Sequence, residues 1–216
     1  MNGSSPESFD RRRGRRALMQ AGLGGLVGLS GFGTVWARAP AAADEGFHAM
    51  PLAADSHALG FTLTDLDGRP RTAASFPGSV LVLFFGFLSC PSICPSTMFE
   101  LQAARRELGA QSRRVRIAFA TLDPERDSPA AMRAWLRHFG DDLIGLRDRP
   151  EAIARATRTL RLFWERVPAG TSSRYTIDHG VQAYVFDPRG RLRLLLRPGP
   201  SPQEVAADWR RLLAGA

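Results

Sequence analysis

Apolar residues in this chain gather in short continuous runs that predict buried β-strands. The run Val-Leu-Val-Leu-Phe-Phe at 80–85 is short enough for a strand buried on both faces, and 115–120 is a second run of this kind. Residues 61–64 instead alternate apolar and polar positions. The Asp67-Gly68 pair that follows them is typical of a hairpin turn.

Helix-start signals separate the expected strands. Ser201-Pro202-Gln203-Glu204 is a capping box with proline at the first helical position, and Pro95 suits the first turn of another helix. The expected helices cover 95–108, 128–139, 148–160 and the segment that follows 201.

Strands that alternate with helices predict an α/β fold. A terminal hairpin of 181–186 and 191–196 makes the sheet mixed, because hairpin strands run antiparallel. The chain of 216 residues is long enough for one ordinary domain plus an appendage. We assign the domain to 59–216, with helices flanking the sheet, and interpret residues 44–58, which lack periodicity, as a linker.

The first 43 residues have the order of an export signal. An arginine-rich stretch at 11–16 precedes an apolar, glycine-rich stretch at 17–36 and then small residues. The Arg15-Arg16 pair favours the twin-arginine route. Alternatively, 17–36 is an uncleaved signal anchor that tethers the protein to a membrane. Both alternatives predict an exported, periplasmic protein, soluble or anchored to the outer face of the inner membrane.

The charge balance is strongly basic, but much of it belongs to this leader. The formal net charge is +8, from 29 basic residues, all arginine, against 21 acidic ones. Six arginines, Glu7 and Asp10 give residues 1–43 a net charge of +4, which leaves +4 for the rest. The remaining arginines have the spacing of a solvated surface, so we do not predict nucleic-acid binding.

The two cysteines of the chain, Cys90 and Cys94, lie where a buried strand is expected to turn into a helix. A helix N-terminus presents free N–H groups and favours a thiolate over a thiol, so both residues are expected to be reactive. In an oxidising compartment such a pair forms a disulfide unless it is reduced or holds a metal. The pair alone is compatible with both redox work and metal binding.

His179 distinguishes these alternatives. Thioredoxin-type oxidoreductases usually separate their cysteines by two residues and place a cis-proline opposite them, whereas here three residues intervene and 175–182 contains no proline. In a thioredoxin-like sheet this segment lies beside the cysteine loop, where the imidazole completes a site of two sulfurs and one nitrogen. A set of three soft ligands suits Cu(I), whereas a structural zinc ion normally has four ligands.

Three sequence blocks resemble the Sco/SenC family, copper proteins with a thioredoxin-like fold. They are the cysteine motif at 86–95, the turn Thr-Leu-Asp-Pro-Glu-Arg-Asp-Ser-Pro at 121–129 and the histidine block within 175–190. The resemblance implies that Cys90, Cys94 and His179 are copper ligands. It also implies a partner, a copper-accepting protein such as the copper-centre subunit of cytochrome c oxidase. The alternative is a thiol–disulfide oxidoreductase that acts on cysteines of an acceptor protein.

Two positions depart from the family pattern without touching a proposed ligand. Ser92 stands where the family commonly has aspartate, and Gly180 stands where it commonly has serine. The missing carboxylate at Ser92 is expected to favour the thiolate form of the cysteines and to shift their redox poise. Gly180 is expected to loosen the histidine segment. Adjacent residues often point apart, so we do not expect Asp178 to orient the imidazole. Met98 is expected to pack in the core.

Overall fold

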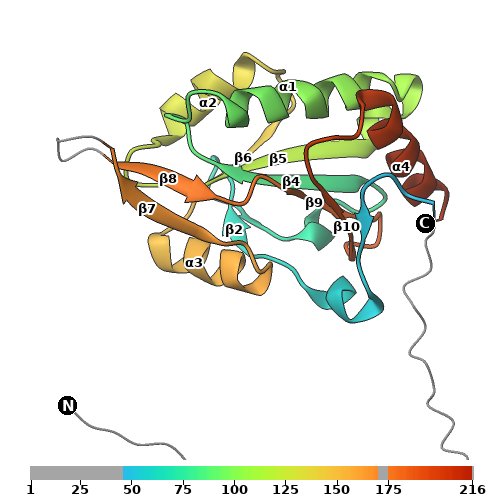
Figure 1. The fold of residues 1–216 in the computed structure, drawn as a ribbon, viewed down its shortest axis with the longest axis horizontal. Helices are drawn as coiled ribbons and strands as arrows, with labels where there is room; N and C mark the ends of the chain where they lie inside the picture. Colours follow the sequence, from blue (N-terminus) through green and yellow to red (C-terminus); the bar gives the residue numbers. More distant parts are fainter. Residues whose placement is uncertain (1–45, 170–174, 216) are drawn as a thin grey trace, which may run out of the picture. The chain divides into compact units, whose positions relative to one another are not determined.

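The computed structural model describes residues 46–169 and 175–215 (Figure 1). The predicted export signal at 1–43, with its possible tether at 17–36, lies outside these residues. Within the described residues, no helix has the length and apolar character needed to cross a membrane.

A six-stranded sheet in the order β1-β10-β9-β4-β5-β6 forms the centre of the fold. β4, β5 and β6 run parallel, whereas β9, β10 and β1 each pair antiparallel with their neighbour, so the predicted mixed sheet is confirmed. The strands are β1 (Met50–Pro51), β4 (Val80–Gly86), β5 (Val115–Thr121), β6 (Ile144–Leu146), β9 (Ala183–Phe186) and β10 (Leu192–Leu196).

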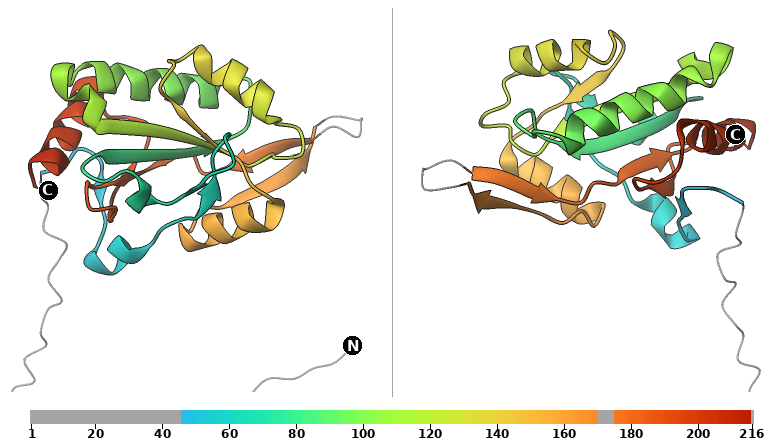
Figure 2. Two further views of the ribbon diagram at one scale, coloured as in Figure 1. Left: turned by 180° about the vertical axis from the view of Figure 1, so that it is seen from behind. Right: turned by 45° about the horizontal axis from the view of Figure 1, so that its top comes forward.

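Four α-helices flank this sheet, as predicted. They are α1 (Ile93–Arg106), α2 (Pro129–Arg137), α3 (Pro150–Thr159) and α4 (Pro202–Ala214). In Figures 1 and 2, α1 and α4 lie over one face of the sheet and α3 over the other. The capping box of Ser201 and Glu204 is present at the start of α4, and the Ser128 side chain caps α2. α1 begins two residues before the predicted Pro95.

The core is centred on β4 and β5 because both strands carry apolar side chains on both faces. Every residue of β4 is buried, and Trp209 of α4 packs against the same core. Burial of one such large side chain contributes about 1.5–3 kcal/mol. The rigid centre of the sheet therefore extends to the end of β4, which leads directly into the cysteine loop.

Two small hairpins accompany the main sheet. β2 (Leu63–Thr64) pairs with β3 (Pro70–Arg71) about the predicted turn, and β7 (Trp164–Pro168) pairs with β8 (Tyr175–His179). The sequence pattern did not predict β7, β8 or β6. β7 is largely solvent-exposed, so it lacks the apolar run that identifies β4. His179 is the last residue of β8.

The interpretation of 44–58 as a linker is wrong for its described part. Residues 50–51 form β1 on the edge of the main sheet, and 54–58 form a short 3-10 helix. The buried carboxylate of Asp208 accepts hydrogen bonds from the backbone N–H of His48, at 3.0 Å, and of Ala49, at 2.7 Å. Two strand residues are too few to show a periodic pattern, so this docking is not visible in the sequence.

Replacing Asp208 with alanine should release this segment. The two N–H groups would lose a charged acceptor, and hydrogen bonds to charged groups contribute about 1.5–3 kcal/mol each. We expect the free energy of unfolding to fall by about 2 kcal/mol or more in guanidinium chloride titrations. Exposed Asp141, replaced in the same way, should stay within about 0.5 kcal/mol of the parent; equal losses in both variants would refute the docking.

Candidate metal centre

The cysteine loop connects the end of β4 to the start of α1. Cys90 lies in the turn, where its N–H donates to the carbonyl of Phe87, and Cys94 lies in the first turn of α1. The backbone N–H of Cys94 donates to Cys90 Sγ at 3.4 Å. Both side chains are buried, Cys94 completely, and neither is in a disulfide.

His179 reaches the cysteine loop from the end of β8. Its Nε2 lies 3.8 Å from Cys94 Sγ, although the two residues are 85 positions apart in the chain. The rings of Phe84 and Phe87 lie 6.3 and 6.0 Å from the imidazole, centroid to centroid. The predicted meeting of the histidine and the cysteine loop therefore occurs, inside an apolar surround.

Hydrogen bonding determines which imidazole nitrogen faces the sulfur as a free acceptor. His179 Nδ1 lies 2.8 Å from the carbonyl oxygen of Gly180. A carbonyl only accepts, so we assign the proton to Nδ1. Burial lowers the pKa of His179, which keeps the ring neutral and leaves the lone pair of Nε2 directed at Cys94. This is the tautomer that binds a metal through Nε2.

Gly180 makes two backbone contacts within the histidine segment. Its N–H donates to the carbonyl of Phe163, and its own carbonyl holds the imidazole. Both contacts use backbone atoms, so they do not depend on the side chain that the family commonly has here. Asp178 is solvent-exposed, in keeping with the expectation that it does not orient the ring.

The expectation that Cys94 is a thiolate is wrong for the metal-free protein. Burial is the main reason why the pKa of the Cys94 thiol lies far above its ordinary value. The position at a helix start is favourable for a thiolate, but complete desolvation outweighs it. In the reduced, metal-free protein, a neutral thiol thus faces a neutral imidazole, and the pocket contains no buried charge at this pair.

Asp127 fixes the cysteine loop to the turn after β5. Its buried Oδ2 accepts hydrogen bonds from the hydroxyl of Thr121 at 2.6 Å and from the N–H of Leu88 at 3.1 Å. Burial, the largest cause, raises the pKa of this carboxyl group. Asp127 therefore organises its own turn and also holds Leu88, the residue two positions before Cys90.

Tyr175 fixes the other end of β8, and sequence reasoning missed this function. Two guanidinium groups lie over the Tyr175 ring, with Cζ of Arg126 at 3.9 Å and Cζ of Arg166 at 4.8 Å from its centroid. Its hydroxyl donates to the buried carboxylate of Asp123 at 2.7 Å, and Arg126 donates to its carbonyl at 2.9 Å. The hairpin that carries His179 is thus attached to the turn after β5.

In their observed positions, the donor atoms do not form a complete coordination site. Among the described residues, no three side chains of His, Cys, Asp or Glu are grouped closely enough to hold one metal ion together. Cys94 and His179 are in contact, whereas Cys90 Sγ is engaged by the N–H of Cys94. Met98 is completely buried and packs in the core, as expected.

Comparison with known proteins gives a consistent result. A family model described as SCO1/SenC matches residues 50–214. The mitochondrial SCO2 homolog of Mus musculus is 33% identical over 156 residues, which are 71% of this chain and 61% of that protein. The chain therefore spans about six-tenths of the length of this curated relative.

Solved structures agree with the fold. Bradyrhizobium japonicum ScoI with copper bound has a TM-score of 0.64 and 35% identity, covering 71% of this chain and 97% of that one. BsSco, described as a member of the Sco family of cytochrome c oxidase assembly proteins with a disulfide switch, has a TM-score of 0.57 and 21% identity over 77% and 97%. The predicted thioredoxin-like fold is confirmed.

Gly86 should be required for the position of the Cys94 sulfur. A Cβ atom at Gly86 would lie 2.8 Å from Cys94 Sγ and 2.9 Å from Phe119 Cε2. We expect Gly86→Ala to lower the free energy of unfolding by about 1–3 kcal/mol, as overpacking does, and to speed maleimide labelling of the displaced thiol. Gly60→Ala is the control, because its Cβ would meet no atom within 4 Å.

Tyr175→Ala should detach the histidine hairpin while the sheet stays folded. Loss of the ring removes both guanidinium contacts and the hydrogen bond to Asp123, so amide exchange in β7 and β8 should accelerate about tenfold or more. Tyr175→Phe, which keeps the ring, should have a smaller effect. Unchanged exchange in the alanine variant would mean that other contacts hold the hairpin.

Proposed function

This chain belongs to the SCO1/SenC family, and we propose that it binds Cu(I) through Cys90, Cys94 and His179 and delivers the ion to a copper-accepting protein. The observation that carries the proposal is the 3.8 Å contact between His179 Nε2 and Cys94 Sγ. The proposed acceptor is a subunit of cytochrome c oxidase that contains a copper centre, in line with the description of the Sco family as oxidase assembly proteins.

The chemistry of the donor set supports copper over other metals. Thiolate sulfur and imidazole nitrogen are soft or intermediate ligands, and Cu(I) accepts two or three of them, whereas a structural zinc site needs four. The described part of the chain offers no carboxylate or second histidine to complete such a site. ScoI, a relative with 35% identity, is a copper-bound protein.

Loading requires proton release and a side-chain movement. Cu(I) binds thiolates, so the proton on the buried Cys94 thiol has to leave as the ion enters. The positive charge of the ion then offsets the negative charge of the thiolate, which the apolar surroundings would otherwise disfavour. Ligation by all three residues also needs a shift from their described positions, and Cys90 is the residue whose sulfur has to turn toward the other two donors.

Delivery is a ligand exchange for which the loop is well placed. Ser89, Pro91 and Ser92 are solvent-exposed around the buried Cys90. An acceptor thiol can therefore approach at Cys90 first, while His179 and Cys94 still hold the ion from inside. We further propose that residues 1–43 direct export, so that this exchange occurs in the periplasm.

A thiol–disulfide reaction is the second candidate, favoured by the close approach of the Cys90 sulfur to the backbone of Cys94. One thiolate of the pair attacks a disulfide of the acceptor, and the second then releases the acceptor as a dithiol. The pair itself becomes the Cys90–Cys94 disulfide, so two electrons pass to the acceptor. Oxidation in this way removes both soft ligands, which would link copper loading to redox state.

Replacement of His179 distinguishes the two candidate functions. With His179→Ala, the copper content of the reduced protein should fall several-fold while the titre of free thiols stays unchanged. His138→Ala is the matched control, because His138 is an exposed residue at the end of α2 and should leave both values intact. A variant that kept full copper binding but lost disulfide reduction would reverse the ranking.

A further inference from the structure

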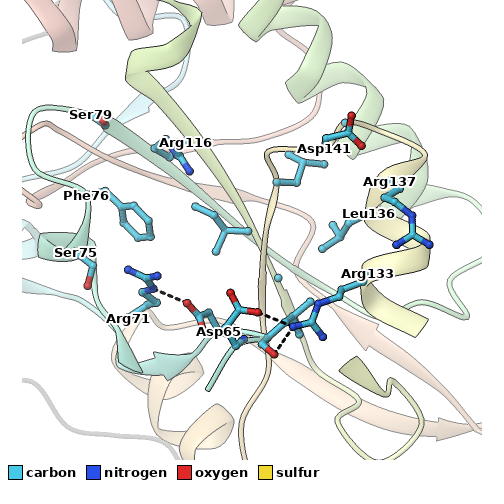
Figure 3. A pocket seen from close by; sticks show the side chains of 16 residues that line it. Asp65, Arg71, Ser75, Phe76, Ser79, Arg116, Arg133, Leu136, Arg137 and Asp141 are labelled. Carbon is cyan, nitrogen blue, oxygen red and sulfur yellow. Dashed lines mark hydrogen bonds and ion pairs between the residues drawn. The ribbon is translucent and has the colours of Figure 1, made fainter. Parts of the chain in front are cut away.

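A cavity among the described residues lies away from the cysteine loop. Its volume is about 640 Å³, and Figure 3 shows the side chains that line it. Ser79, just before β4, and Arg116, near the start of β5, belong to this lining. Both lie at the opposite end of these strands from Cys90, and neither cysteine nor His179 contributes to the wall. The cavity is therefore a separate feature of the fold.

The cavity wall is rich in charged side chains and has one more positive than negative group. Four guanidinium groups line it against three carboxylates: Arg71, Arg116, Arg133 and Arg137 against Asp65, Asp67 and Asp141. In Figure 3, the first two of these arginines lie on one side with Phe76, and the other two lie across from them.

Two of the four arginines are already neutralised. Arg71 Nε binds Asp65 Oδ2 at 2.8 Å, and Arg133 Nη2 binds Asp67 Oδ1 at 2.7 Å. These pairs use Asp65 and Asp67, so Asp141 is the remaining carboxylate of the lining. Neither Arg116 nor Arg137 has an ion pair within the described residues.

Arg116 is the feature that points to a ligand. Its Nε is buried and has no hydrogen-bond partner among the described residues. A buried donor without a partner costs about 1–3 kcal/mol, and more when it is charged. The nearby carboxylate of Asp142 does not relieve this cost, because Arg105 holds both of its oxygens at 2.6 and 2.7 Å.

We propose that this cavity binds a small oxyanion, a phosphate or carboxylate compound, with Arg116 as its principal partner. The planar fork of a guanidinium group matches the paired oxygens of both classes. An anion held by the accessible part of Arg116 would place a negative charge beside its buried, unpartnered Nε. Arg137 adds positive charge at the rim. The cavity is larger than inorganic phosphate requires, so the ligand is an organic anion whose body rests on the wall beside Phe76.

Calorimetric titration of the purified protein with inorganic phosphate and, separately, with malonate tests the proposal. At constant ionic strength we expect saturable binding of at least one probe at one site per chain. Arg116→Gln should weaken that binding about tenfold or more, as loss of a charged hydrogen bond does. The probe that binds more tightly identifies the class of oxyanion.

Controls distinguish the site from general attraction to a basic protein. Arg158→Gln removes an equal charge from an exposed position on α3 and should leave the affinity unchanged. At the same concentration, the probe should raise the melting temperature of the parent more than that of Arg116→Gln. Absence of saturable binding by both probes, or equal weakening in the two variants, would overturn the proposal.

Discussion

The contact between Cys94 Sγ and His179 Nε2 depends on several independent parts of the fold. β4 must end where Gly86 leaves room for the sulfur, and the turn after β5 must hold both the cysteine loop and the histidine hairpin. Asp127 supplies the first attachment and Tyr175 the second. A small displacement of either would separate two atoms that the chain places 85 residues apart, and the proposed chemistry would be lost with them.

Burial controls the state of this pair before any metal arrives. Desolvation disfavours both the thiolate of Cys94 and the protonated form of His179, so the resting pair is neutral. A soft cation changes this balance by replacing the thiol proton. The same buried sulfurs would serve a disulfide reaction, so the imidazole, which only metal binding needs, is the informative residue. Its proton on Nδ1 is fixed by the backbone of Gly180.

The sequence predicted those features that a local pattern can express. Continuous apolar runs gave β4 and β5, and capping residues gave the starts of α2 and α4. β7 escaped notice because it is exposed, and β1 because it has two residues. The thiolate expectation for Cys94 failed because a sequence shows the position at a helix start but not the depth of burial. The cavity at Arg116 has no local signature, since Arg71 and Arg133 reach it from distant segments.

X-ray absorption at the copper edge of the reduced, copper-loaded protein is the decisive experiment for the three-residue site, because it counts the neighbours of the ion by element. We expect two sulfur ligands and one imidazole nitrogen, with the nitrogen signal absent after replacement of His179. A copper site with sulfur ligands alone in the parent protein, or a nitrogen signal that persists without His179, would contradict it.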